Sequence, residues 1–245
     1  MALFTIGSAT AQGIKRNVNQ DSLHAHVFDD ETALALIADG LGSYADSAEA
    51  SALTCKLVTA SLVQAGIAAL DRRALVAAVQ AANLALWEQA DERGMHLKTT
   101  LTTMVLRSPE ILIAHVGDCR VYHAHDGIVR QVTHDHSVVK GDPFSRIIGR
   151  FTKNGGGIPR HLLNRVIGEN PIVRVDVEVV PVAAADRFVI CSDGIWDAIA
   201  PDDFVKLLST VPDDNEAAAR FVQIARDNGT TDDASTIVIT TPAQN

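Results

Sequence analysis

Acidic residues recur beside the ends of apolar segments in this sequence. Asp39 follows one such segment directly, Asp118 and Asp193 follow two others after a single residue, and Asp232 and Asp233 precede the segment 236–239. A single Asp beside Gly is ordinary turn chemistry. Turns do not require this pattern at the end of each long apolar segment, however. The repetition therefore suggests that the carboxylates meet at one shared metal centre.

The residue types restrict which ion such a centre would hold. Carboxylate oxygens, without zinc-type Cys spacing or a His-rich set, favour Mg²⁺ or Mn²⁺. A pair of these ions bridged by carboxylates can lower the pKa of a water molecule and direct it at phosphorus. Phosphate-ester hydrolysis is the natural use of this chemistry. Arg16, five residues before Asp21, is the best candidate to bind the phosphate through two parallel hydrogen bonds.

Two other phosphatase mechanisms are excluded by the sequence. A cysteine nucleophile of that class needs an Arg six positions later, but the three cysteines are followed at that distance by Ser61, His125 and Asp197. The aspartyl-phosphate mechanism needs two Asp separated by one residue, and the sequence contains no such pair.

The composition fits an intracellular globular protein. The chain has 245 residues, of which 47% are hydrophobic, enough to bury the core of one large domain, which we assign to residues 1–245. The net charge of -9 argues against binding to nucleic acid or to an acidic membrane. Three scattered cysteines suit reduced thiols in the cytosol. No apolar run is long enough for a signal sequence or a membrane span, so we expect a soluble, cytoplasmic protein, with a monomer as the default.

The hydrophobic periodicity predicts strands grouped with strands and helices grouped in pairs. The predicted helices are 46–65, with Asp46 or Ser47 as the N-cap, 72–93, 201–209 and 214–227. The predicted strands are 3–10, 22–28, 34–38, 101–106, 111–116, 121–124, 128–133, 172–180, 187–191 and 236–240. This grouping favours an α+β fold of two antiparallel sheets with helices outside. The Gly-rich, basic segment 140–158 indicates a flap-like insertion spanning about 138–170.

Seven segments occur in a recognisable order: 16–21, 39–43, 99–100, 116–122, 131–137, 191–197 and 233–236. They resemble, in that order, the motifs R-x-x-N-[EQ]-D, D-G-x-G-G, G-T-T, V-G-D-S-R-x-Y, Q-x-T-x-D-H-S, C-S-D-G-L-W-D and D-N-x-T. These belong to the metal-dependent Ser/Thr protein phosphatase family, type 2C, in its compact bacterial form. The resemblance implies a four-layer αββα sandwich. It also implies a phosphatase that hydrolyses phosphoserine and phosphothreonine with a water activated by two metal ions.

The resemblance implies two to three divalent cations, Mn²⁺ or Mg²⁺, and a role for each matched residue. Asp39 would bridge two ions. Asp193 and Asp233 would complete the first ion's ligands, while Asp21 and the carbonyl group of Gly40 would serve the second, partly through water. Phosphoprotein substrates and a cognate bacterial Ser/Thr kinase are the expected partners.

Two further roles follow from the same resemblance. Asp118 would help Asp193 hold a third, weaker ion, and Arg16 would hold the substrate phosphate. Leu41 occupies a position where some family members carry a His proposed as general acid. Water would then have to protonate the leaving alkoxide.

The sequence departs from the family motifs at Ser43, Lys98, Cys119 and Ala234. None of these changes removes a metal-binding carboxylate. Asp232 is an alternative to Asp233, but the spacing to Thr236 favours Asp233. An inactive phosphoprotein-binding relative and an enzyme for small phosphate esters are the other hypotheses.

Several histidines invite a metal-binding interpretation. For His134 and His136, hydrogen bonding within the fold is the preferred interpretation. His24 and His26 lie on one strand face, as do His123 and His125, so either pair could bind a metal. The preferred interpretation is that these side chains face solvent. Trp196 is interpreted as a core residue, and Cys191 as a buried, inert thiol.

Overall fold

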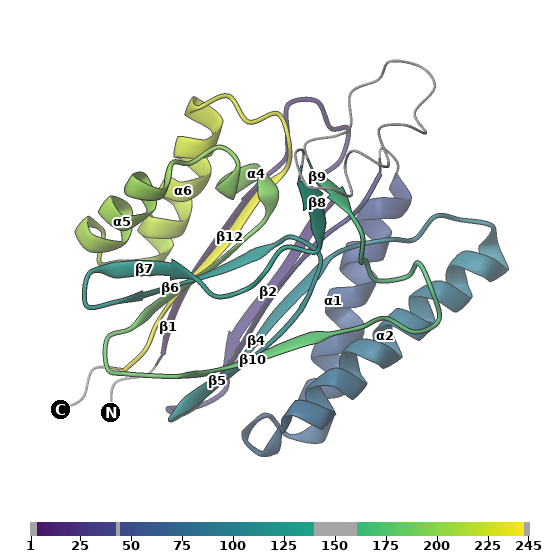
Figure 1. Ribbon diagram of the computed structural model, residues 1–245, viewed down its shortest axis with the longest axis horizontal. Coiled ribbons are helices and arrows are strands. Elements are labelled where there is room, and N and C mark those ends of the chain that lie inside the picture. Colours follow the sequence, from purple (N-terminus) through teal and green to yellow (C-terminus); the bar gives the residue numbers. More distant parts are fainter. Residues whose placement is uncertain (1–3, 43–44, 140–160, 243–245) are drawn as a thin grey trace.

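Two five-stranded antiparallel sheets stack face to face in the computed structural model, which describes residues 4–42, 45–139 and 161–242 (Figure 1). The first sheet contains, in order, β1 (Thr5–Ala11), β12 (Ala234–Thr240), β11 (Arg187–Cys191), β6 (Arg120–His125) and β7 (Ile128–Gln131). The second contains β10 (Asp176–Pro181), β5 (Glu110–Val116), β4 (Leu101–Arg107), β3 (Thr32–Asp39) and β2 (Asp21–Val27). A small separate sheet pairs β8 (Ser137–Val139) with β9 (His161–Leu163).

Helices cover the outer face of each sheet. The second sheet carries α1 (Ala45–Ala65) and α2 (Arg72–Arg93), which are joined through the short 3₁₀ helix η1 (Ile67–Ala69). The first sheet carries α4 (Asp193–Trp196), α5 (Pro201–Thr210) and α6 (Asp214–Asp227). Figure 1 shows the resulting order of layers, with helices, sheet, sheet and helices. The predicted α+β fold, a four-layer αββα sandwich, is confirmed.

Strand β3 shows why the sandwich has separate hydrophobic cores. Leu34, Leu36 and Ala38 face the core beneath α1 and α2, whereas Ala33, Ala35 and Ile37 face the core between the sheets. Successive strand side chains point to opposite faces, so a strand covered on both faces must be apolar throughout. A third core lies beneath α5 and α6. The uninterrupted apolar run before Asp39 is therefore a central strand.

The element boundaries follow from local capping. Asp71 caps α2 by accepting a hydrogen bond from the Ala74 N–H at 2.8 Å, and Gly94 ends it in the left-handed conformation with φ 61°. Asp213 caps α6 in the same way. The cap predicted for the first helix is wrong, because α1 begins at Ala45 and so includes Asp46 and Ser47.

Smaller corrections concern strand ends. The strand predicted at 172–180 begins at Asp176, and the one predicted at 128–133 ends at Gln131. Ser43 and most of the predicted flap at 138–170 lie outside the described residues, although β8 and β9 at its edges pair with each other. None of the helices within the described ranges combines the length and the apolar character that crossing a membrane requires.

Candidate metal centre

Strand pairing brings the first two predicted metal ligands together. Asp21 is the first residue of β2, Asp39 is the last of β3, and the two are directly opposite each other in the antiparallel register. Side chains at directly opposed positions lie on the same face of a sheet, with Cβ atoms about 5 Å apart. Asp193 begins α4, one residue after the end of β11, and Asp118 lies in the turn between β5 and β6.

The backbone of Asp39 is held by two neighbouring threonines. The Thr100 N–H donates to the Asp39 carbonyl at 2.8 Å, and the Asp39 N–H donates to Thr100 Oγ1 at 2.9 Å. The Thr99 hydroxyl also donates to the Asp39 carbonyl, at 2.8 Å. Next to them, a Cβ on Gly40 would lie only 2.1 Å from the Ser47 carbonyl oxygen, so this turn accepts only glycine. The segments 99–100 and 39–43 thus together fix the backbone at the end of β3.

The negative charges of the clustered carboxylates are poorly balanced by other groups of the protein. Burial, followed by repulsion from Asp21 and Asp193, raises the pKa of Asp39 well above its ordinary value. Burial and then Asp118 do the same to the pKa of Asp193. Burial raises the pKa of Asp21 to about 7, despite a hydrogen bond from the Ser192 hydroxyl at 2.8 Å, and that of Asp118 to about 6. Such a group of acidic side chains fits divalent cations, which would relieve the repulsion.

One oxygen atom gives independent support for that fit. Asp21 Oδ1 is buried and has no hydrogen-bond partner among the described residues. A buried carboxylate oxygen without a partner is costly unless a cation takes the position. The structure therefore has both the charge and the free donor atom that a hard metal ion needs.

Asp233, the residue favoured by the sequence, uses its carboxylate in another way. It is 3% exposed, and Oδ1 accepts a hydrogen bond from the Gly13 N–H at 2.7 Å. Oδ2 accepts a second one from the Gln20 N–H at 2.8 Å. Both oxygens thus hold the backbone of the segment that leads into β2. This geometry favours a structural role for Asp233.

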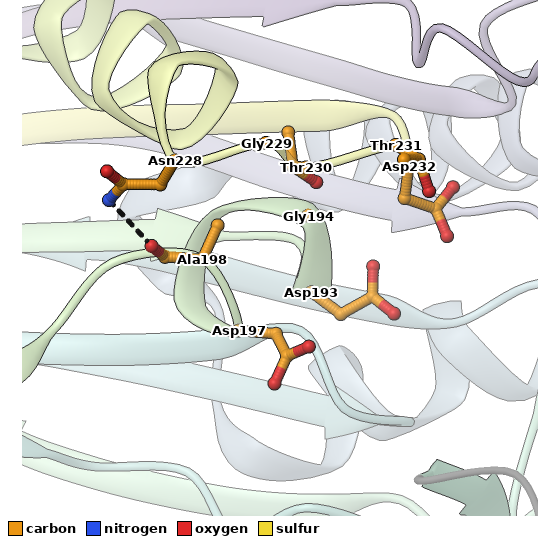
Figure 2. Close-up of a pocket in the computed structure, with 9 residues that line it drawn as sticks. All are labelled: Asp193, Gly194, Asp197, Ala198, Asn228, Gly229, Thr230, Thr231 and Asp232. Carbon is orange, nitrogen blue, oxygen red and sulfur yellow. Dashed lines mark hydrogen bonds between the residues drawn. The ribbon is translucent and has the colours of Figure 1, made fainter.

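Asp232, the alternative, faces the other carboxylates. It lines a pocket together with Asp193, Gly194 and Asp197, and Figure 2 shows the carboxylates of Asp193 and Asp232 pointing toward the same open side of it. Its charge also contributes to the raised pKa values of Asp39, Asp193 and Asp118. The geometry therefore favours Asp232 over Asp233 as the third main carboxylate of this cluster.

The difference between Asp232 and Asp233 is one residue, which reverses the side on which an extended backbone places its side chain. The sequence did carry the signal. Counting the motif spacing to the hydroxyl of Ser235, instead of that of Thr236, selects Asp232.

Arg16 lies at the rim of this cluster, beside Asp232. Its Nε and Nη2 atoms both donate to Asp232 Oδ1, at 2.8 and 2.5 Å. Nη1 donates to Gln20 Oε1 at 2.7 Å and to the Gly42 carbonyl at 2.9 Å. The guanidinium is thus anchored beside the carboxylates while remaining partly exposed.

Trp196 and Arg120 stack on each other and hold the backbone of Asp118. Trp196 Nε1 donates to the Asp118 carbonyl at 2.9 Å, and the Arg120 guanidinium lies 3.5 Å from the centre of the Trp196 ring. Arg120 also forms two parallel hydrogen bonds with Asp135, through Nε at 3.0 Å and Nη2 at 2.7 Å. His136 Nδ1 accepts the Gly117 N–H at 3.0 Å, which agrees with its predicted structural role. The motifs around Asp118 therefore hold its turn in place.

Comparison with known proteins gives the same picture. The family model described as protein phosphatase 2C matches residues 11–226. The serine/threonine phosphatase stp of Listeria monocytogenes is 27% identical over 239 residues, covering 94% of this chain and 93% of that protein. The crystal structure of the PPM Ser-Thr phosphatase MsPP from Mycobacterium smegmatis, in complex with cacodylate, aligns with a TM-score of 0.78 at 30% identity over 100% of both chains. The catalytic domain of the serine threonine protein phosphatase PstP, in complex with 2 manganese ions, aligns with a TM-score of 0.77 at 25% identity, over 98% of this chain and 99% of that one. The chain belongs to the protein phosphatase 2C family.

Proposed function

We propose that this protein removes phosphate from phosphoserine and phosphothreonine in other proteins, with Mn²⁺ or Mg²⁺ as cofactor. Membership of the protein phosphatase 2C family makes it a Ser/Thr protein phosphatase. The observation that carries the mechanistic proposal is the convergence of carboxylates from distant segments, which raise each other's pKa values.

The metal-binding residues in this proposal are Asp21, Asp39, Gly40, Asp118, Asp193 and Asp232. Asp39 and Asp21 face each other across β2 and β3, so they can serve neighbouring ions. Asp193 and Asp232 line one pocket, and Asp118 adds to the negative charge around Asp193. When bound, two or three such ions supply Lewis-acid charge and lower the pKa of water at the site. The relative PstP, solved with 2 manganese ions, supports this choice of metal.

Arg16 is proposed to bind the substrate phosphate. Its guanidinium lies beside Asp232 at the rim of the carboxylate cluster, and a guanidinium can offer a phosphate two parallel hydrogen bonds. The relative MsPP is solved with cacodylate, a tetrahedral oxyanion like phosphate. Residues from β2, β3 and α4 would thus hold the cofactor, while Arg16 orients the group to be cleaved.

The biological setting is proposed on separate grounds. We propose phosphoprotein substrates and an opposing Ser/Thr kinase, because this activity requires both. The acidic net charge of -9 speaks against a nucleic-acid partner or an anionic membrane surface. A cytoplasmic monomer remains the proposed state.

The test is phosphate release from phosphoserine and phosphothreonine peptides. We expect turnover with Mn²⁺, none after removal of metal with EDTA, and recovery when Mn²⁺ is restored. Asp39→Asn should abolish turnover in the presence of Mn²⁺. Full activity in EDTA would refute the proposal, and phosphopeptide binding without phosphate release would identify a binding module instead. A higher kcat/KM for nucleotides than for phosphopeptides would indicate a small-molecule enzyme.

A further inference from the structure

Two histidines and a buried aspartate meet at the opposite end of the first sheet. His123 and His125 lie two residues apart on β6, and so on the same face, while Asp186 immediately precedes the neighbouring strand β11. One ligand atom from each of the three residues lies within 4.8 Å of the others. The expectation that both histidines face solvent is wrong for His123, which is 4% exposed.

The contacts within this group leave one buried nitrogen unsatisfied. His125 Nδ1 lies 2.6 Å from Asp186 Oδ1, in hydrogen-bonding geometry. His123 Nε2 lies 2.9 Å from Asp186 Oδ2, but the atoms are not aligned for a hydrogen bond, and the nitrogen has no such partner among the described residues. The Asp186 oxygen therefore lies beside the axis of this ring nitrogen. A metal ion binds along that axis, so the carboxylate is placed to share it.

Two of the three groups, His123 and Asp186, are held in the form that binds metal, whereas the hydrogen bond and charge of Asp186 raise the pKa of His125. Burial lowers the pKa of His123, which keeps its imidazole neutral. Burial opposes the ionisation of Asp186, but the Ala183 N–H and the two imidazoles outweigh it and lower the pKa of the carboxyl group. The Ala183 N–H donates to Asp186 Oδ2 at 2.9 Å and so orients the carboxylate.

One neighbour opposes a cation at this position. Arg130 Nη2 lies 3.3 Å from His123 Nδ1. Arg130 is exposed, so its long side chain can move into solvent when an ion binds. The half-exposed side chain of His125 provides the route of entry.

We propose that His123, His125 and Asp186 form a second metal site, which takes Zn²⁺ or a similar transition-metal ion and leaves its remaining coordination to water. Two imidazoles and one carboxylate are a donor set that zinc uses, in contrast to the oxygen-only cluster at the other end of the sheet. Asp186 precedes β11 and Asp193 follows it, which separates the two sites by roughly 20 Å. The ion would join β6 to the turn before β11. It would also reach the end of β12, because the Thr241 N–H donates to the Asp186 carbonyl at 2.9 Å.

The experiment is a Zn²⁺ titration against a chromophoric chelator, with Mg²⁺ at saturating concentration to occupy the carboxylate cluster. His125→Gln is the test variant, since this half-exposed side chain can change without opening the core. The matched control is His24→Gln with His26→Gln, which removes a His pair of the same spacing on β2. Circular dichroism confirms that each variant is folded.

We expect the wild-type protein and the control to bind one more Zn²⁺ than His125→Gln, or to bind it at least about tenfold more tightly. Co²⁺ in place of Zn²⁺ should give visible absorption bands that are lost in His125→Gln. Phosphatase activity with Mg²⁺ should be the same in all three proteins. Equal zinc binding by the wild-type protein and His125→Gln would overturn the proposal and leave a hydrogen-bonded His–Asp pair.

Discussion

At the scale of single residues, the function of an acidic side chain here depends on its direction rather than on its type. Asp232 and Asp233 are adjacent and chemically identical, yet one faces the carboxylate cluster and the other accepts hydrogen bonds from two backbone N–H groups. The proposed metal site therefore gives a sharp comparison between two neighbouring substitutions.

Asp232→Asn should lower kcat/KM for a phosphopeptide with Mn²⁺ by at least about hundredfold, because it removes a charged metal ligand. Asp233→Asn keeps one acceptor oxygen for the Gly13 and Gln20 N–H groups. It should instead cost about 1–3 kcal/mol of unfolding free energy, with a much smaller effect on kcat/KM. Steady-state kinetics and urea denaturation of both variants distinguish the two effects. The reverse pattern would restore Asp233 as the ligand.

Arg16 is the second residue whose role can be isolated. Arg16→Lys keeps the positive charge but loses the paired hydrogen bonds, so kcat/KM should fall by about 10- to 100-fold. Inorganic phosphate should also inhibit the variant more weakly than the wild-type protein. Lys15→Ala, which alters an exposed cation next to it, is the control. Unchanged phosphate inhibition in Arg16→Lys would remove Arg16 from the phosphate site.

At the scale of elements, strand ends determine the geometry of the site. The antiparallel register sets Asp21 opposite Asp39. Thr99 and Thr100, which directly precede the neighbouring strand β4, hydrogen-bond to the backbone of Asp39 at the end of β3. Displacements of about 1 Å can lower enzymatic rates about hundredfold, so this anchoring is expected to matter for activity.

Thr100→Val tests the anchoring, because it removes the oxygen that accepts the Asp39 N–H and leaves every carboxylate in place. We expect kcat to fall by about 10- to 100-fold and a higher Mn²⁺ concentration to be needed for half-maximal activity. Thr103→Val is the matched control, since Thr103 is buried three residues further along, on β4, and among the described residues its hydroxyl donates to the Ala35 carbonyl, at 3.5 Å. Equal kinetics for the two variants would contradict a specific role for Thr100.

At the scale of the whole molecule, folding brings together the acidic side chains of the carboxylate cluster. Their mutual repulsion lowers the stability of the folded state. The pKa of Asp21 is raised to about 7 and that of Asp118 to about 6, and burial and repulsion also raise those of Asp39 and Asp193 well above their ordinary value. A raised carboxyl pKa means that the folded state binds protons more strongly than the unfolded state. This stabilisation is complete below the unfolded value of about 3.9 and is lost as the pH rises through about 6 to 7.

The metal-free protein should therefore lose stability between about pH 4 and pH 7, and Mn²⁺ should restore it at and above the upper end of this range. At about a hundredfold excess over its Kd, Mn²⁺ should raise the Tm near pH 8 by about 5–10 °C, with a smaller rise near pH 5. Thermal unfolding with EDTA or Mn²⁺ at each pH measures this. An Asp193→Asn variant should show a weaker pH dependence without metal. An equal Mn²⁺ shift at both pH values would contradict the link between the cluster and stability.

The sequence by itself determined the layers and named most of the candidate site residues. Hydrophobic period and capping residues predicted the sheets and helices, because the burial of apolar faces requires those periods. Motif spacing selected Asp21, Asp39, Asp118, Asp193 and Arg16 as candidates that the fold brings into one region. Only the tertiary structure distinguished the surroundings of Asp232 from those of Asp233, since it shows which carboxylate meets distant backbone N–H groups. It likewise showed that His123 is buried against Asp186, a contact between residues 63 positions apart that no local pattern specifies.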